Sequence, residues 1–82
     1  MLFNVKIPDA DRISEEDRKR LGRLGQLIVG GAWFGSVPED HGTAMLIGMQ
    51  AEMGTDAARI VAGVLRVRQD TLYVTRTEPP LN

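Results

Sequence analysis

Four side chains in this sequence are suited to acid–base chemistry or to the binding of a small organic molecule. His41 is the single histidine, and an imidazole readily exchanges a proton near neutral pH. Tyr73 carries a phenol that can donate a hydrogen bond, and the Arg76 guanidinium could hold a carboxylate through two parallel hydrogen bonds. Trp33 offers a large aromatic surface to a ligand. We therefore predict His41, Tyr73 and Arg76 as catalytic residues and Trp33 as a substrate-binding residue.

Each of these four residues also has a structural interpretation. His41 falls in a polar turn, where a histidine is most often solvated. Trp33 and Tyr73 could anchor the core or a dimer interface, in which aromatic residues are enriched. Arg76 could protect the exposed edge of a sheet, as charged residues on edge strands do. The sequence leaves both interpretations open.

The sequence contains no pattern typical of a cofactor site. A single histidine, no cysteine and dispersed carboxylates provide no spacing of metal ligands. The pair Gly30-Gly31 lacks the further glycines and the lysine of a phosphate-binding loop, so we interpret it as the end of a helix. We therefore predict neither a metal nor a nucleotide cofactor.

Length and charge restrict the class of protein. We expect one domain over residues 1–82, and a domain of this size buries only about 60% of the surface that its unfolded chain exposes. Without cysteines for disulfides, self-association is the remaining means of stabilisation, which predicts a homodimer or a higher homo-oligomer. A net charge of −1 provides no field that would attract nucleic acid. Because there is no signal-like N-terminus and no run of about twenty apolar residues, we expect a cytoplasmic protein that does not bind membranes.

Alternating apolar residues predict four strands. The first and the last cover residues 2–7 and 70–77. Between them, residues 32–37 and 43–50 form a hairpin around a polar turn at 38–42, which is too short for a crossover helix. Both alternating sets of side chains in the strand 43–50 are apolar, so we expect this strand to be central and covered on both faces.

A first helix is expected to begin after Ser14, which can cap it, and to end at the glycine pair. Acidic residues fill its first turn, where the helix dipole favours negative charge. Glu15 with Lys19 and Glu16 with Arg20 have the spacing of ion pairs along a helix.

Two glycines, Gly22 and Gly25, interrupt this helix, and each costs about 1 kcal/mol relative to alanine. Close packing of the helix against the sheet would explain them, and so would space for a ligand beneath the helix. A second helix over residues 57–65 is expected to follow a cap at Thr55-Asp56.

The order strand, helix, strand, strand, helix, strand predicts an α+β protein with the ferredoxin-like βαββαβ fold. Right-handed crossovers place both helices on one face of a four-stranded antiparallel sheet. The other face would then carry one of the two apolar sets of the hairpin, with either Trp33 and Val37 or Phe34 among its side chains. Because an uncovered apolar face is typical of an association surface, we predict a dimer that forms through the open faces of two sheets.

The opening segment Met-Leu-Phe-Asn-Val-Lys-Ile is similar to the first strand of the muconolactone isomerase family, within the dimeric α/β-barrel superfamily. The resemblance implies a cofactor-free isomerase that acts on lactones of aromatic catabolism. The branch of the superfamily with a catalytic histidine in helix one and an Asp-Pro-Phe segment is disfavoured. Here helix one has no histidine, and Arg66-Val67-Arg68 follows helix two.

Two functional hypotheses follow. The first is a small cofactor-free enzyme of the isomerase or lyase type that transfers a proton on a small organic acid or lactone, in a pocket between sheet and helices near Trp33 and Tyr73. The second is a non-catalytic ligand-binding or accessory dimeric module. A closed pocket with an ionisable group turned inward would favour the enzyme, whereas a filled core with charges only at the surface would favour the module.

Overall fold

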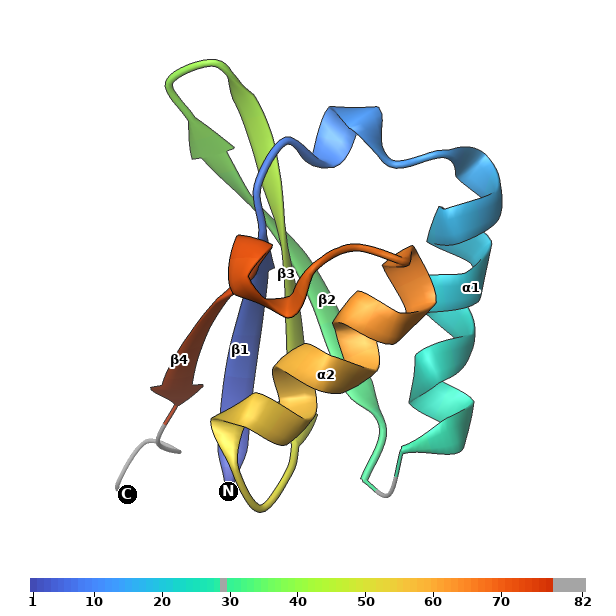
Figure 1. The fold of residues 1–82 in the computed structure, drawn as a ribbon, viewed down its shortest axis with the longest axis vertical. Helices are drawn as coiled ribbons and strands as arrows, with labels where there is room; N and C mark the ends of the chain where they lie inside the picture. The colour runs from blue at the N-terminus through green and yellow to red at the C-terminus, as the bar shows by residue number, and fades with distance from the viewer. Residues whose placement is uncertain (29, 78–82) are drawn as a thin grey trace.

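The computed structural model describes residues 1–28 and 30–77 (Figure 1). The α-helices are α1 (Glu15–Leu27) and α2 (Gly54–Leu65). The strands are β1 (Leu2–Ile7), β2 (Ala32–Glu39), β3 (Gly42–Gln50) and β4 (Tyr73–Thr77). Two short 3-10 helices, η1 (Ala10–Arg12) and η2 (Gln69–Thr71), precede α1 and β4.

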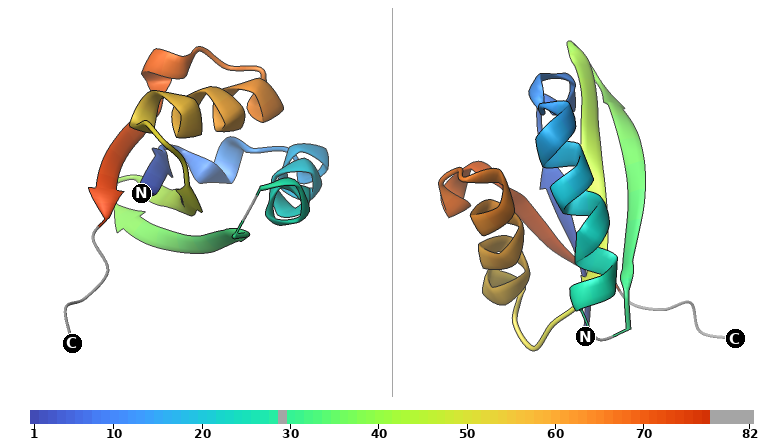
Figure 2. Two further views of the ribbon diagram at one scale, coloured as in Figure 1. Left: turned by 90° about the horizontal axis from the view of Figure 1, so that it is seen from below. Right: turned by 90° about the vertical axis from the view of Figure 1, so that its right-hand side faces the viewer.

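The strands form one antiparallel sheet in the order β2-β3-β1-β4, so β1 and β3 are central and β2 and β4 are the edges. Figure 2 shows both α-helices on the same side of this sheet, and no helix of the described chain covers the other side. The predicted α+β class, the element order and the antiparallel sheet are thus confirmed. The arrangement is compatible with the ferredoxin-like fold.

The core lies between the sheet and the helices and follows from the alternation of β1 and β3. Phe3, Val5 and Ile7 are buried on the helix-facing side, where Val5 pairs with Ile47 and Phe3 pairs with Met49. The helices and η2 complete the core with Leu21, Leu24, Ala57, Val61, Ala62 and Leu72. The second apolar set of β3 points to the side without helices. β3 is therefore central, as predicted, and the α-helices cover only one of its faces, while Leu46 on the other face stays partly exposed.

The β2–β3 hairpin is tighter than predicted. β2 continues to Glu39 and β3 begins at Gly42, so Asp40 and His41 alone form the turn, and Gly42 has φ 120°. The predicted hairpin is confirmed, but its turn is shorter than the predicted 38–42 because Pro38 and Glu39 belong to β2 and Gly42 to β3. Proline is tolerated there because an edge strand has a row of N–H groups that pair with no neighbour.

α1 begins where the sequence predicts but ends at Leu27, with the extended Ile28 as its C-cap, before the glycine pair is reached. The Ser14 hydroxyl accepts a hydrogen bond from the Asp17 backbone N–H at 3.1 Å, and the chain leaves the helix through the glycine pair, with φ 88° at Gly30. Arg20 Nη2 lies 2.9 Å from Glu16 Oε1, as expected. The pair expected between Glu15 and Lys19 does not form.

The two glycines of α1 have different surroundings. Gly22 is exposed, and a Cβ placed on it would meet no atom within 4 Å. A Cβ on Gly25 would touch only the Ala32 backbone nitrogen, at an ordinary 3.7 Å. Close packing and ligand space beneath the helix are therefore both wrong for Gly22.

α2 and β4 begin at residues other than those predicted. α2 starts at Gly54 with Met53 as its N-cap, and Met53 makes no side-chain capping bond, so the predicted Thr55-Asp56 cap is wrong. β4 starts at Tyr73 rather than at residue 70, because the preceding residues form η2. Thr71 Oγ1 closes that turn by donating to the Arg68 carbonyl at 2.6 Å. The predicted end of the strand at Pro79-Pro80 lies outside the described residues.

Candidate functional site

The sheet separates the predicted site residues onto its two faces. Trp33 pairs with Gly48 and Tyr73 pairs with Lys6, which places both aromatic side chains on the open face. Arg76 pairs with Phe3 and therefore lies on the helix-facing side, opposite to Tyr73 as alternation predicts. The structure does not bring the predicted residues into one site.

The indole of Trp33, on β2, lies next to Gly48 of the neighbouring strand β3. A Cβ placed on Gly48 would stand 3.4 Å from Trp33 Cε3 and 3.0 Å from Asn4 Oδ1, so the absence of a side chain at Gly48 makes room for the indole. Trp33 remains 54% exposed and Tyr73 62% exposed. The expected pocket between sheet and helices near Trp33 and Tyr73 is therefore wrong, because neither side chain points to that side.

An open cleft of about 500 Å³ lies at the hairpin end of the sheet. It is lined by Lys6, Pro8, Asp9, Pro38, Glu39, Asp40 and His41. Lys6 Nζ approaches Glu39 Oε1 to 3.2 Å, and Ala44, which lies between them on the same face, is fully buried. His41 is thus exposed in the turn but shares this cleft with an ion pair.

A second open cleft, of about 600 Å³, lies between α2, η2 and β4, and is named here the α2–β4 cleft. It is lined by Phe3, Met53, Gly54, Thr55, Ala58, Gln69, Asp70, Leu72, Val74 and Arg76. Its apolar floor includes Phe3, Ala58 and Leu72, which are all buried. A Cβ on Gly54 would stand 3.1 Å from Val74 Cγ1, so glycine allows α2 to begin this close to β4.

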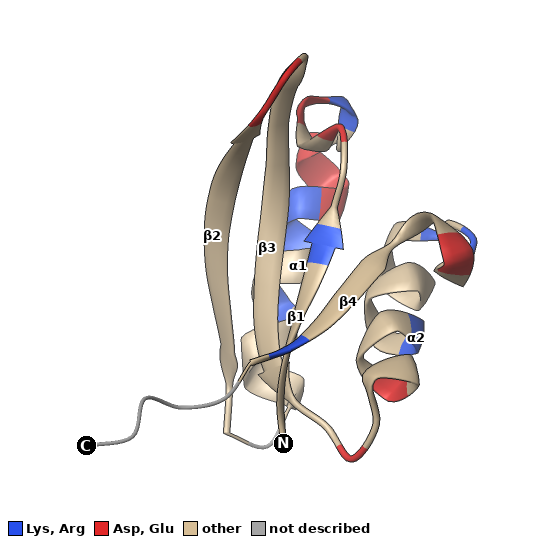
Figure 3. Ribbon diagram, turned by 90° about the vertical axis from the view of Figure 1, so that its left-hand side faces the viewer, with Lys and Arg blue, Asp and Glu red and all other residues tan. Residues whose placement is uncertain are grey.

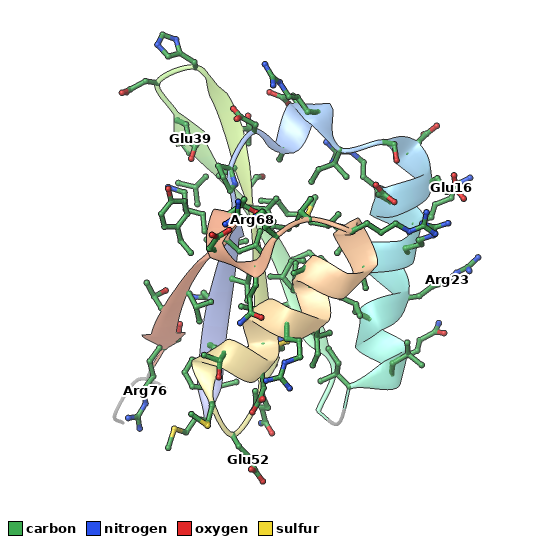
Figure 4. All side chains as sticks on the ribbon, viewed as in Figure 1. Glu16, Arg23, Glu39, Glu52, Arg68 and Arg76 are labelled. Carbon is green, nitrogen blue, oxygen red and sulfur yellow. The ribbon has the colours of Figure 1, made fainter. Side chains whose placement is uncertain are left out.

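Polar groups lie along the rim of the α2–β4 cleft. Gln69 Nε2 donates to the Thr55 carbonyl at 3.2 Å and so ties η2 to α2. Asp70 Oδ2 accepts a hydrogen bond from Arg68 Nη2 at 2.6 Å. In Figure 4, Arg76 lies at the end of the molecule remote from Glu39, on the side where α2 begins. The two clefts are therefore at opposite ends of the sheet, and His41 and Arg76 cannot act on one small substrate within a protomer.

The chemistry that the described residues offer is limited to surface groups. No polar or charged side chain is buried among residues 1–28 and 30–77. The same residues contain no group of three or more histidine, cysteine or acidic side chains placed to hold a metal ion.

Sequence reasoning selected Arg76 but missed the α2–β4 cleft around it. Alternation along β4 predicts only that Arg76 and Tyr73 lie on opposite faces, and the pocket was expected beside Tyr73. The depth of the cleft depends on Gly54 approaching Phe3 and Val74, residues distant in sequence, for which no local pattern exists.

Comparison with protein-family models, with curated proteins and with solved structures finds no match to this chain. The resemblance to the muconolactone isomerase family therefore stays a prediction. In the part of the chain that the structure describes, neither α1 nor α2 is long and apolar enough to cross a membrane.

Proposed function

We propose that two copies of this protein pack through the open faces of their sheets, and that the dimer is a module that binds a small, partly apolar organic molecule in the α2–β4 cleft of each protomer. The observation that carries the proposal is that the two sides of one sheet differ. One side has an apolar face without a cover, and the other has an apolar cleft with a polar rim.

The open face supports the dimer. Trp33 and Tyr73 are more than half exposed there, and Leu46 and Val37 are partly exposed between the strand ends. Figure 3 views the sheet with α1 behind it, and the middle of the strands carries few charged residues. Each large apolar side chain contributes about 1.5–3 kcal/mol when it becomes fully buried, so a second sheet packed on this face would stabilise both copies.

The position of the α2–β4 cleft supports ligand binding in the same assembly. The cleft opens beside α2, on the helix side of the sheet, so a partner on the open face leaves it accessible. Its size is in the range of about 300–1,000 Å³ that small-molecule sites occupy. Its lining combines a buried apolar floor with a few polar groups, which is the usual composition of such sites.

Native mass spectrometry tests the dimer. We expect the wild-type protein to give a dimer mass and Leu46→Lys to give a monomer, because the lysine ammonium would be buried in the centre of the interface. Leu27→Lys is the matched control, since Leu27 is 79% exposed at the end of α1 and away from the open face. A monomeric wild type, or the same loss of dimer in both variants, would contradict the proposal.

The same spectra test ligand binding. We expect the purified wild type to retain a small molecule as an added mass, and Ala58→Leu to lose it, because a larger side chain would project from the floor into the cleft. An added mass that persists in Ala58→Leu would place the ligand elsewhere.

Proton transfer is a second candidate function, and the cleft at the hairpin end favours it. His41, Lys6 and Glu39 gather there, and Tyr73 lies next to Lys6 on the same face. A base at this position could take a proton from the carbon beside the carbonyl of a small acid or lactone, and the proton could return at another position, as in an isomerase. Deuterium incorporation into such compounds in D2O, present in the wild type and lost in His41→Gln, is the expected result. Equal incorporation with His41→Gln would exclude His41 as the base.

A further inference from the structure

The two edges of the sheet differ in length and in charge. β2 has eight residues and β4 has five. No residue of β2 before Glu39 is charged, whereas β4 carries Arg76. A long, uncharged edge strand is a template for another chain, because its free backbone groups can continue the sheet. We infer that β2 pairs antiparallel with β2 of a second copy, across a two-fold axis at Phe34, through an interface separate from the face-to-face dimer proposed above.

The hairpin determines which backbone groups of β2 point away from the sheet. Its turn is two residues long, so Glu39 and Gly42 on either side of it form a hydrogen-bonded pair. Every second residue of β2 from Glu39 back to Trp33 then bonds to β3. The residues between them direct their backbone groups outward, and they are Ala32, Phe34, Ser36 and Pro38. Pro38 agrees with this assignment, because a proline in the outward set removes no bond to β3.

The outward row of β2 has no partner in the described chain. β2 is the outermost strand, and the right-hand view of Figure 2 shows no helix or strand beyond it. Among residues 1–28 and 30–77, no turn, loop or helix cap forms a backbone hydrogen bond with Ala32, Phe34 or Ser36. Donors and acceptors for a further strand are therefore present along this edge.

A two-fold axis at Phe34 uses this row in full. Phe34 then faces the partner's Phe34, and Ala32 faces the partner's Ser36, so each of these residues can both donate and accept a bond. An axis at Gly35 would instead place Ala32 opposite the partner's Pro38, which has no N–H group to donate. The missing donor at Pro38 thus favours the axis at Phe34.

The side chains of β2 suit the same register. Phe34 is 47% exposed, and two such rings opposite each other form a stabilising cross-strand pair. Trp33 lies opposite the partner's Gly35, so the partner presents no side chain that would collide with the indole. Glu39, the one charge of β2, lies outside the paired residues 32–36, and no like charges meet across the axis. The strand is therefore complementary to itself.

The edge contact is weaker than a contact between two sheet faces, because one strand joined to one strand buries less apolar surface. It therefore forms at a higher protein concentration than the face dimer, by mass action. The free backbone groups of β2 lie in the plane of the sheet, so a partner on the open face leaves them accessible. Concentrated protein should thus link face dimers through β2.

Amide hydrogen exchange of Leu46→Lys tests the strand pairing after the face contact has been removed. Exchange at Ala32, Phe34 and Ser36 should be several-fold slower at about 1 mM protein than at about 50 µM, because association protects the outward N–H groups. The N–H group of Gly35 bonds to β3 within one chain, so it is the internal control and should be protected at both concentrations.

A charge exchange at Phe34 tests the two-fold register. In the Leu46→Lys background, Phe34→Lys and Phe34→Glu should each stay monomeric at about 1 mM in sedimentation equilibrium, because like charges would meet at the axis. An equimolar mixture of the two should form a dimer that contains one chain of each, since opposite charges then face each other. Ile60→Lys and Ile60→Glu are matched controls on α2, where Ile60 is 39% exposed, and each should dimerise alone.

Each outcome decides the inference. Exchange at the outward row that does not depend on concentration would overturn it and would leave the β2 edge for a strand of another protein. A dimer that survives both Phe34 variants, or a mixture of folded variants that stays monomeric, would overturn the two-fold register. If the Phe34 variants fail to fold, the exchange rates decide, because they need no substitution in β2. The face dimer is tested separately, by the mass of the wild type in dilute solution.

Discussion

The two faces of β3 present similar side chains to different surroundings. On the helix-facing side, Ile47 and Met49 are fully buried by β1 and the helices. On the open side, Leu46 stays partly exposed, and Trp33 covers only the space left by Gly48. The covering layer, rather than the apolar character of the strand, therefore decides which face stabilises the single chain. The apolar side chains of the open face can stabilise the folded state in full only when another protein molecule covers them.

Substitution of neighbouring residues on β3 tests this contrast and gives the largest expected effect. Ile47→Ala should lower the free energy of unfolding by about 2–5 kcal/mol, because it removes buried methylene groups and leaves a cavity. Leu46→Ala should cost only about 1 kcal/mol in dilute protein, since the side chain is already partly exposed. Urea denaturation measures both values.

The free energies of unfolding of these variants should also depend differently on protein concentration. If a partner covers Leu46, the loss caused by Leu46→Ala should grow as the protein concentration rises, because association stabilises the folded state by mass action. The difference between wild type and Ile47→Ala should depend much less on concentration. Equal losses for the two variants in dilute protein would contradict the contrast between the faces.

Gly48 and Gly35 provide a second, smaller test on the open face. A Cβ on Gly48 would crowd Asn4 and Trp33, so Gly48→Ala should cost about 1 kcal/mol, at the lower end of the range for overpacking because the exposed Trp33 can shift and the Asn4 contact involves only the end of a side chain. Gly35→Ala is the matched control, since a Cβ there meets no atom within 4 Å. Gly48→Ala should also change the fluorescence of Trp33. Unchanged fluorescence would show that the indole does not rest on Gly48.

The two faces could be predicted from the sequence because alternation is a local signal. Apolar residues at every second position of β1 indicate which of its side chains share a face, and Ser14 marks the start of α1 through a bond within one turn. The hairpin turn was predicted too long because Pro38 normally indicates a turn, and its tolerance in β2 depends on that strand being an edge.

The candidate site could be predicted from the sequence only in part. Alternation placed Arg76 opposite to Tyr73, but the cleft beside Arg76 depends on η2 and on the start of α2. η2 forms because Thr71 bonds to the Arg68 carbonyl, whereas residues 70–77 read as one alternating strand. The start of α2 depends on contacts of Gly54 with Phe3 and Val74, which only the folded chain brings together.

The smallest expected effect concerns the one charge on β1, Lys6, which pairs with Glu39 at 3.2 Å across the open face. The side chains are 40% and 24% exposed, so solvent screens the pair, and Lys6→Gln should lower the free energy of unfolding by less than about 1 kcal/mol. The loss should shrink further in high salt, because screening also weakens the wild-type pair. Lys19→Gln, at an exposed position of α1, controls for the change of net charge and should have no effect beyond a few tenths of a kcal/mol. A loss of several kcal/mol for Lys6→Gln that does not depend on salt would contradict this expectation. It would mean that the hairpin end of the open face is covered. The two faces of the sheet would then differ only at the other end, around Trp33.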